Sequence, residues 1–189
     1  EATTIIERMS NSMLHGGPDD FGSFVDVENG LALGHRRLSI IDLSKNGLPE
    51  ATATDVTFRR IGLHGANAKN GDYSRLKVTE SSCRGADFSG GFFRGCSFFG
   101  TERIEAIFAG STLAGSSFFT TRLGNADFSG SRLQSTTFNS CELFGVRFSR
   151  SLLMNCKFVA QDRGNVTLDR ADFSNAILVD CDLLGANLF

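Results

Sequence analysis

Large apolar residues recur every five positions from residue 86 to residue 188, in segments such as ADFSG at 86–90 and 126–130 and ADFSN at 171–175. From Phe88 onward, nineteen of the 21 central positions are Phe or Leu, and the other two are Arg103 and Arg163. A helical face recurs at three and four residues and a strand alternates with period two, so a period of five requires a chain that turns at each repeat. The pattern therefore predicts a solenoid.

The type of central residue repeats every 20 positions. Two sets of central positions are mostly aromatic and a third is mostly Leu: Phe88, Phe108, Phe128, Phe148, Leu168 and Leu188; Phe98, Phe118, Phe138, Phe158 and Leu178; Phe93, Leu113, Leu133, Leu153 and Phe173. The residue two places earlier is nearly always small. This pattern predicts a coil of 20 residues with four sides, in which large and small side chains fill a narrow core.

The motifs ADFSG, ADFSN and GANLF resemble the pentapeptide-repeat family, whose loose motif is A-(D/N)-L-x-x with Phe allowed at the centre. The resemblance covers residues 86–189. It implies an all-β fold, namely a right-handed, four-sided parallel β-helix with four pentapeptides per coil. About five coils at ~4.8 Å each predict a rod roughly 25 Å long.

Residues 1–50 do not follow the five-residue frame. Apolar residues from Ile5 to Leu14 recur at helical spacing, which predicts a short amphipathic helix that ends at the HGGPDD segment. Residues 23–27 and 31–41 then read as two strands joined at Asn29-Gly30, a strong hairpin signal. The N-terminal segment is therefore expected to be α+β.

The run HGGPDDFGSFVDVENGLALGHRRLSIIDLS at 15–44 resembles the glutaminase domain of asparagine synthase and its class II amidotransferase relatives. That resemblance implies an N-terminal nucleophile fold that hydrolyses glutamine with an amino-terminal Cys. Arg37 matches the arginine that holds the substrate carboxylate in that family, whereas Gly16 replaces the arginine of HRGPDD. The first cysteine is Cys83, inside the repeat frame, so we expect a glutaminase remnant that caps the solenoid.

Residues 51–85 can be placed in the same frame. Stepping backwards from Phe88 gives Phe58, Leu63, Ala68, Tyr73, Val78 and Cys83 at central positions. Degenerate coils are the favoured interpretation, with a loose linker as the alternative. The expected division is therefore a cap at 1–50, coils or linker at 51–85 and the β-helix at 86–189.

Composition narrows the function classes. The net charge is −2, no stretch of 18 apolar residues occurs, and no secretory signal is visible at the start, so we expect a cytoplasmic protein without a membrane partner. The cysteines show neither metal-ligand spacing nor a disulfide framework; Cys141 and Cys181 would share a side but lie ~9.6 Å apart, two coils away. We expect no metal, no cofactor and no catalytic group.

The outward positions are where a partner would bind. Phe99 and Phe119 stand one coil apart beside Ile104, and they form either an apolar patch covered by residues 1–50 or a partner site. Another outward column contains Glu102, Glu142, Asp162 and Asp182, interrupted by Arg122. Because some pentapeptide-repeat relatives protect DNA gyrase by imitating DNA, this column raises the alternative of a topoisomerase-binding protein, although acids and bases nearly balance.

We therefore expect a non-enzymatic scaffold or protein-binding rod of unknown partner, with topoisomerase binding or a glutaminase fragment as alternatives. Arg103 and Arg163 at central positions are expected to swing outward at bulges, or their repeats to leave the coil as loops, because an unpaired buried guanidinium is costly. The C-terminal repeat reaches Phe189 without a visible cap. An open solenoid end exposes strand edges and core, so we expect either dimerisation through that end or a missing C-terminal part.

Overall fold

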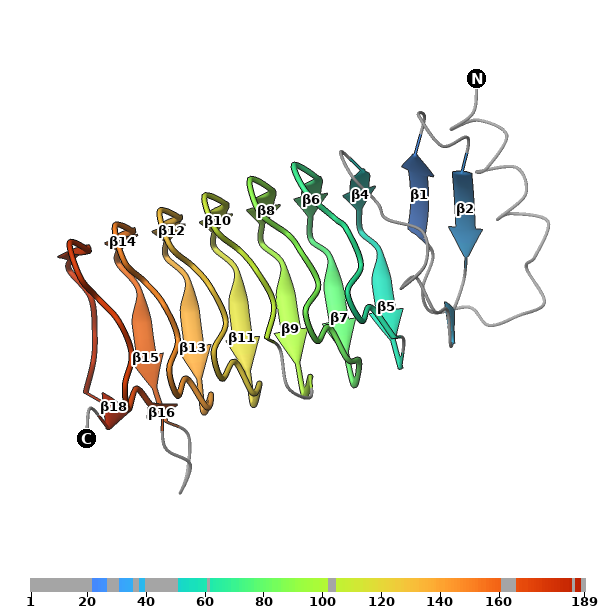
Figure 1. The fold of residues 1–189 in the computed structure, drawn as a ribbon. Coiled ribbons are helices and arrows are strands. Elements are labelled where there is room, and N and C mark those ends of the chain that lie inside the picture. The colour runs from blue at the N-terminus through green and yellow to red at the C-terminus, as the bar shows by residue number, and fades with distance from the viewer. Residues whose placement is uncertain are drawn as a thin grey trace.

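The computed structural model describes residues 51–60, 62–101, 105–160, 166–184 and 186–187, together with the backbone of three strands between residues 22 and 39. These residues form a parallel β-solenoid of about six coils, with no helix in the described part of the chain (Figure 1). The all-β solenoid expected from the five-residue period is confirmed. The helix expected near Leu14 lies outside the described residues.

Two long sheets form two sides of the solenoid, and every contact between successive coils in them is parallel. The nine-stranded sheet contains, in spatial order, β17 (Ile177–Val179), β14 (Leu152–Met154), β12 (Arg132–Gln134), β10 (Thr112–Ala114), β8 (Phe92–Arg94), β6 (Asp72–Ser74), β4 (Thr52–Thr54), β1 (Gly22–Asp26) and β2 (Leu31–His35). The seven-stranded sheet contains β15 (Lys157–Val159), β13 (Thr137–Asn139), β11 (Ser117–Phe119), β9 (Ser97–Phe99), β7 (Lys77–Thr79), β5 (Thr57–Arg59) and β3 (Leu38–Ser39).

The other two sides are held by single bridges between coils, such as Asn67 with Asp87 and Arg122 with Glu142. One short pair of strands, β16 (Val166–Thr167) and β18 (Ala186–Asn187), joins the last coils on one of these sides. Each coil therefore has four sides, as the 20-residue period predicts. Residues 51–85 contribute β4 to β7, which pair in register with the strands that follow them.

The predicted hairpin is confirmed, but its second strand, expected over residues 31–41, ends at His35, and Leu38–Ser39 forms β3 of the other sheet. Strands β1 and β2 pair antiparallel, with Asp26 opposite Leu31 at the turn. Strand β1 also pairs antiparallel with β4, and β3 pairs parallel with β5, so the N-terminal strands extend both sheets beyond the first coil (Figure 1). The hairpin thus pairs with the edge of the first coil, where an open solenoid would expose unpaired N–H and C=O groups.

Each five-residue repeat turns a corner because one of its residues has a left-handed backbone conformation, with positive φ. Positive φ values recur two residues after the central residue, for example at Gly115 (φ 61°) and Asn155 (φ 52°). Gly enters this region without steric cost, and Asn, Asp and Ser tolerate it better than branched residues. The chain therefore runs as a strand of three residues, turns, and starts the next side.

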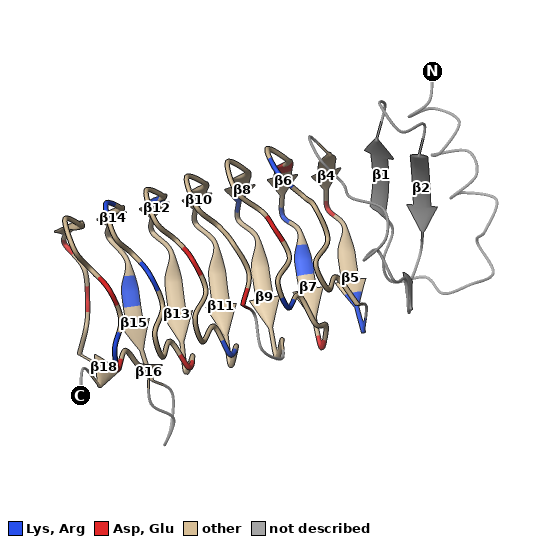
Figure 2. Cartoon of the chain, viewed as in Figure 1, with Lys and Arg blue, Asp and Glu red and all other residues tan. Residues whose placement is uncertain are grey.

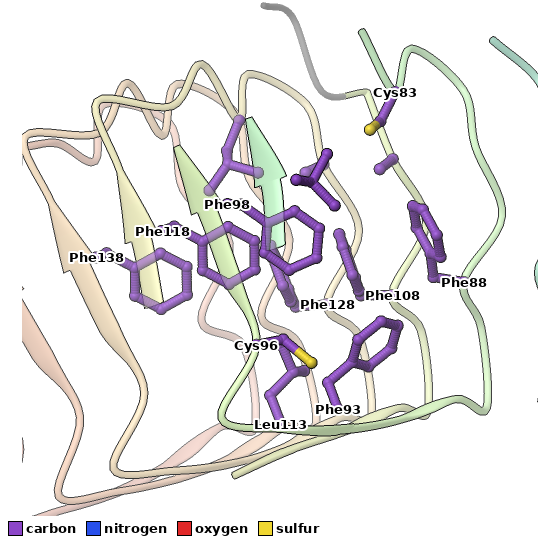
Figure 3. Close-up of a cluster of buried hydrophobic side chains, with 14 of the residues drawn as sticks. Cys83, Phe88, Phe93, Cys96, Phe98, Phe108, Leu113, Phe118, Phe128 and Phe138 are labelled. Atoms are coloured by element: carbon purple, nitrogen blue, oxygen red, sulfur yellow. The ribbon is translucent and has the colours of Figure 1, made fainter. Parts of the chain in front are cut away.

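The central Phe side chains form two stacked columns inside the solenoid (Figure 3). In one column the rings of Phe98 and Phe118 are 4.8 Å apart and nearly parallel, and the stack continues through Phe138 and Phe158. The second column, from Phe88 to Phe148, meets the first edge-on, with ring centroids about 5.8–6.0 Å apart. Burying each Phe stabilises the fold by about 1.5–3 kcal/mol, and each stack adds about 0.5–1.5 kcal/mol.

Small residues complete the core two places before each central residue. The side chains of Ala106, Ser111, Ser116 and Thr121 are all buried. The hydroxyls of Ser111 and Ser116 donate hydrogen bonds to the carbonyls of Phe108 and Phe93. Polar residues are therefore accommodated inside because they bond to the backbone of the same solenoid.

The expected 20-residue period is wrong after residue 160, although the five-residue step continues. Glu142 pairs with Thr167, Arg147 with Asp172 and Lys157 with Asp182, so partners are 25 residues apart instead of 20. The five additional residues are 161–165, which include Arg163 and lie outside the described residues. As a result Phe173 stacks on Phe148, with ring centroids 5.0 Å apart, and Leu178 pairs with Leu153. The predicted columns, in which Leu168 follows Phe148 and Leu178 follows Phe158, are therefore wrong.

The same shift corrects the placement of the cysteines. Cys141 and Cys181 do not share a side, because Lys157 pairs with Asp182 and the preceding residues, Cys156 and Cys181, therefore share a row. All five thiols are free, and four of them are buried. Arg103, the other exception at a central position, lies outside the described residues.

Candidate interaction surface

The residues on either side of each central residue point outward and form the surface of the solenoid. In β9, Phe98 is buried, Ser97 is half-buried and Phe99 is exposed. In-register pairing places the corresponding residues of successive coils directly beside one another, ~4.8 Å apart. Any outward side chain therefore belongs to a column that runs along the rod.

The most ordered apolar feature on this surface is a pair of rings on the seven-stranded sheet. Phe99 and Phe119 stack with centroids 5.3 Å apart and an interplanar angle of 9°. Strands β9 and β11 pair in register and place them one above the other, and 47% of Phe99 remains exposed. We call these two residues the aromatic pair.

The N-terminal strands do not cover the aromatic pair. Strands β1 and β3 pair with β4 and β5 at the end of the solenoid, whereas β9 follows β5 and β7 in its sheet. The expectation that residues 1–50 cover Phe99 is therefore wrong for the strands that the structure describes. Ile104, expected beside the pair, lies outside the described residues.

Other exposed aromatics lie on different sides. Phe92, of which 49% is exposed, belongs to β8 of the nine-stranded sheet. Phe144 lies on the side next to the seven-stranded sheet, and the Arg170 guanidinium stands 5.4 Å from its ring centroid. A cation over an aromatic face is a favourable contact. Neither residue therefore extends the aromatic pair into a larger patch.

The predicted acidic column does not form as expected. Glu142 has Arg122 on one side, at 3.3 Å, and Thr167 on the other. Asp182 stands beside Lys157 on a different side, because the five additional residues shift it. Glu102 and Asp162 lie outside the described residues. The described acids of this set are thus separated from one another by basic or neutral residues.

Charges of both signs are scattered along the described coils (Figure 2), and several of them stand next to an opposite charge. Ion pairs join residues about one coil apart, as in Arg75 with Asp55 at 2.5 Å and Arg147 with Asp127 at 2.8 Å. The hydrogen bond from Arg75 holds the pKa of the Asp55 carboxyl below its usual value. Exposed pairs of this kind contribute little to stability, but they leave no wide field of one sign on the described faces.

Three coils near the N-terminal end border an open hollow of about 460 Å³, lined by Arg60, Gly62, His64, Glu80, Ser81, Ser82 and Gly100. The Ser82 hydroxyl and the Nε2 atom of His64 are 2.9 Å apart. Hydrogen bonds from Arg60 and Arg59 hold the pKa of Glu80 below its usual value. Sequence reasoning missed this group, because Ser82 and His64 are 18 residues apart and meet only when the coils stack.

The Ser82–His64 contact alone does not make a hydrolytic site. A nucleophilic serine needs a base that is itself oriented by a third group, usually a carboxylate. Glu80 bonds instead to Arg59 and Arg60, and in the part of the chain that the structure describes no carboxylate contacts His64. The hollow is therefore a surface feature with two of the three groups that such chemistry requires.

Two residues bear on the glutaminase resemblance: Arg37, which it implies as a substrate contact, and Cys83, which is the first cysteine of the chain. Arg37 lies outside the described residues. Cys83 is completely buried, and burial raises its pKa to about 12, so its thiolate is not formed near neutral pH. No group of three or more His, Cys, Asp or Glu side chains with metal-binding geometry occurs among the described residues.

The last coil exposes a cluster of apolar residues. On strand β17, 61% of Ile177 is exposed and both Leu178 and Val179 are also exposed. Leu184, two residues after Asp182, has 95% of its surface exposed. Strand β17 is the edge strand of the nine-stranded sheet, so its outer backbone groups are free of strand partners among the described residues. Within those residues, no helix is long and apolar enough to cross a membrane.

Comparison with known proteins agrees with this geometry. Residues 121–158 and 165–189 match the family model of pentapeptide repeats, in eight copies, and residues 1–56 match the model of a glutamine amidotransferase domain. The repeat match stops at 158 and resumes at 165, which is where the coil register changes. No curated protein matches the chain significantly.

Several solved structures are similar to this chain. The pentapeptide repeat protein Rfr23 of the cyanobacterium Cyanothece 51142 has 11% identity and a TM-score of 0.44 over 73% of this chain and 88% of its own. QnrB1, a plasmid-mediated fluoroquinolone resistance protein, has 18% identity and a TM-score of 0.32 over 79% and 84%. A pentapeptide repeat protein of the Arabidopsis thaliana thylakoid lumen has 12% identity and a TM-score of 0.38 over 69% of each chain. The described residues thus form a parallel β-solenoid in which residues 121–158 and 165–189 match pentapeptide repeats, preceded by a segment that matches a glutamine amidotransferase domain.

Proposed function

We propose that this chain is a non-enzymatic scaffold that binds a partner protein on the outward face of the seven-stranded sheet. The observation that carries this proposal is the aromatic pair, Phe99 and Phe119. Two large rings are held parallel at 5.3 Å on neighbouring strands, and Phe99 keeps nearly half of its surface exposed. Aromatic side chains on a rigid surface are typical energetic anchors of protein interfaces.

The rigidity of the solenoid favours binding at this pair. Phe98 and Phe118, the central residues between the outward positions, are fully buried and stacked on each other. The strands that carry the aromatic pair are thus fixed from inside, and a partner loses little free energy in ordering them. Polar residues border the pair along its column, with Thr79 on β7 and Asn139 on β13. An apolar anchor with a polar rim is the usual anatomy of a binding patch.

A photo-crosslinking experiment tests this proposal. A photoreactive phenylalanine at position 99 is expected to crosslink to one discrete partner protein, and Phe119→Ser is expected to abolish the crosslink. The matched control carries the same group at position 92, which is equally exposed but lies on the nine-stranded sheet. With the purified partner, Phe99→Ala is expected to weaken binding about tenfold or more. Equal crosslinking from both positions, or unchanged affinity, would contradict a specific site at the aromatic pair.

A second copy of the chain is the partner that we propose for the C-terminal end. Strand β17 presents exposed Ile177 and Val179 at the edge of the nine-stranded sheet. An apolar edge strand pairs readily with an identical strand, and a two-fold axis makes such a contact closed. This homodimer is compatible with partner binding at the aromatic pair, because Phe99 and Phe119 lie on the other long sheet.

A topoisomerase-binding role has less support. Imitation of DNA requires a dense negative surface, whereas most of the described acids form ion pairs with bases, as Glu142 does with Arg122. If the chain were such a protein, it would protect gyrase supercoiling from quinolones in a purified assay. Glutaminase activity also has little support, because residues 1–56 match the amidotransferase model but contain no cysteine. The free thiols favour a reducing compartment such as the cytoplasm.

A further inference from the structure

The five additional residues at 161–165 bring two thiols together. Because Lys157 pairs with Asp182, the preceding residues Cys156 and Cys181 occupy the same inward row in consecutive coils. Their sulfurs make equivalent contacts one coil apart. Cys156 Sγ donates to the carbonyl of Leu133 at 3.5 Å, and Cys181 Sγ donates to the carbonyl of Leu153 at 3.5 Å.

The spacing of the two cysteines suits a disulfide. Neighbouring parallel strands are ~4.8 Å apart, which falls within the Cα–Cα range of about 4.4–6.8 Å found in disulfides. Inward side chains in an equivalent row of the next side do touch between coils, since the hydroxyls of Thr101 and Thr121 are 3.3 Å apart. Among the described cysteines, only Cys156 and Cys181 occupy neighbouring coils in one inward row. Cys96, for example, has Ser116 as its neighbour in the next coil.

We propose that Cys156 and Cys181 form a redox-sensitive dithiol, which closes into a disulfide and fastens the last coil to the coil before it. The proposal does not depend on the scaffold function. The oxidant is a small disulfide such as oxidised glutathione. The last coil is the least buried part of the described solenoid. A covalent link there would therefore stabilise the coil that packing stabilises least.

The exchange proceeds in two balanced steps. The Cys181 thiolate, after its proton passes to solvent, attacks one sulfur of oxidised glutathione, forms a mixed disulfide and releases one glutathione thiolate. The Cys156 thiolate then attacks Sγ of Cys181, forms the internal disulfide and releases the second glutathione thiolate. The two cysteines are oxidised by two electrons in total, and one oxidised glutathione is reduced to two thiols.

Burial decides the order of these steps. Cys181 is partly exposed, whereas Cys156 is buried. Desolvation raises the pKa of the Cys156 thiol to about 11, so few Cys156 thiolates exist at neutral pH. Attack therefore begins at Cys181, and the second step is the slower one. Once the mixed disulfide has formed, Cys156 is already beside it.

Peptide mapping of the full chain tests the proposal. After treatment with oxidised glutathione at pH 8, the number of free thiols is expected to fall from five to three, with a Cys156–Cys181 crosslinked peptide found without reduction. Cys181→Ser should abolish the crosslink. The matched control Cys141→Ser should leave it intact, because Cys141 is also buried but adjoins Thr121 and Val166 in its row. A stable mixed disulfide at Cys181, or crosslinks between two chains, would overturn the proposal.

Hydrogen exchange tests the fastening of the last coil. Oxidation is expected to slow amide exchange in residues 177–184 relative to the same residues in the Cys181→Ser variant, and dithiothreitol should restore the original rate. By loop-closure arguments the apparent Tm should also rise by roughly 5–10 °C. A crosslinked protein with unchanged exchange and unchanged Tm would disprove the fastening role.

Discussion

Phe128 contacts aromatic rings in three directions. It stacks on Phe108 below and on Phe148 above, and it meets Phe118 and Phe138 of the other column edge-on. One residue further along the chain, Ser129 points outward. Its backbone N–H donates to the Asp127 carboxylate at 2.8 Å, and its half-buried hydroxyl donates to the same carboxylate and accepts from the Ser149 hydroxyl. Two adjacent positions therefore differ sharply in what a substitution removes.

Replacing Phe128 by Ala is expected to cost about 3–5 kcal/mol of unfolding free energy, because it leaves a cavity between four rings. Ser129→Ala is expected to lower it by about 1 kcal/mol or less, because only the half-buried hydroxyl bonds are lost and the backbone bond to Asp127 remains. Denaturant unfolding of both variants checks the difference. Equal effects at the two positions would contradict the inward frame.

Buried thiols make the fold sensitive to alkali. Burial raises the pKa of Cys83 and Cys141 to about 12, well above the value of about 8.5 for an unfolded thiol. The stabilising contribution of a group with a raised pKa is fully present below its unfolded pKa, and it is lost as the pH rises towards the folded value. The protein should therefore lose stability above about pH 9.

The expected loss is up to ~1.4 kcal/mol per thiol for each pH unit between about pH 9 and 11. Guanidinium unfolding at pH 8 and pH 10 measures it. The variant Cys83→Ala should show a smaller fall between the two pH values than the parent protein. An identical fall in both would show that this thiol is not responsible.

At the scale of the element, each five-residue repeat forms one side of a coil. Residues 161–165 stand outside this scheme, because the coils before and after them pair as if they were absent. Val166 then occupies the small inward position that Cys141 holds one coil earlier, and both are fully buried. A whole repeat has thus been added without disturbing the stack.

Deleting residues 161–165 is therefore expected to leave the Tm within about 3 °C of the parent, because the described coils on either side already pair with one another. Deleting 121–125, a repeat inside the coil, should lower the Tm by about 5 °C or more. That deletion moves the following repeats by one side, so Leu133 would stack on Phe108 and Phe138 on Leu113. Thermal melts of the two deletion variants give the comparison, and similar losses in both would refute this register.

The central residues up to Phe158 could be predicted from the sequence, because a five-residue step and a 20-residue period together determine which side chains face inward. The later columns could not. An added repeat keeps the five-residue step intact, so only the pairing between coils reveals that Phe173 stacks on Phe148. The Ser82–His64 contact escaped for a similar reason, since it crosses two coils diagonally. The local sequence pattern likewise predicts the hairpin but does not indicate that it pairs with the β4 edge of the first coil.

At the scale of the whole molecule, the two ends of the rod differ. Strands β1 and β3 occupy the edges of the first coil at the N-terminal end. At the other end, β17 is an open edge strand whose Ile177 and Val179 side chains are exposed. Association of two chains is therefore favoured at the C-terminal end.

Sedimentation equilibrium is expected to show a dimer, and the double variant Ile177→Lys/Val179→Lys is expected to be monomeric, because two charges would be desolvated in the contact. Met154→Lys is the control, since Met154 is also exposed but lies on β14, one strand in from the edge. Dissociation by the control variant as well, or a dimer that survives the double variant, would place the contact elsewhere.

The antiparallel contact between β1 and β4 has a consequence for assembly size. A parallel solenoid with two bare ends can add copies head to tail without limit, and such growth produces filaments. Here β1 and β3 already pair with β4 and β5, so a second copy at this end would meet the hairpin strand β2 or the short β3 instead of a parallel coil. We therefore expect the N-terminal strands to disfavour head-to-tail growth of filaments.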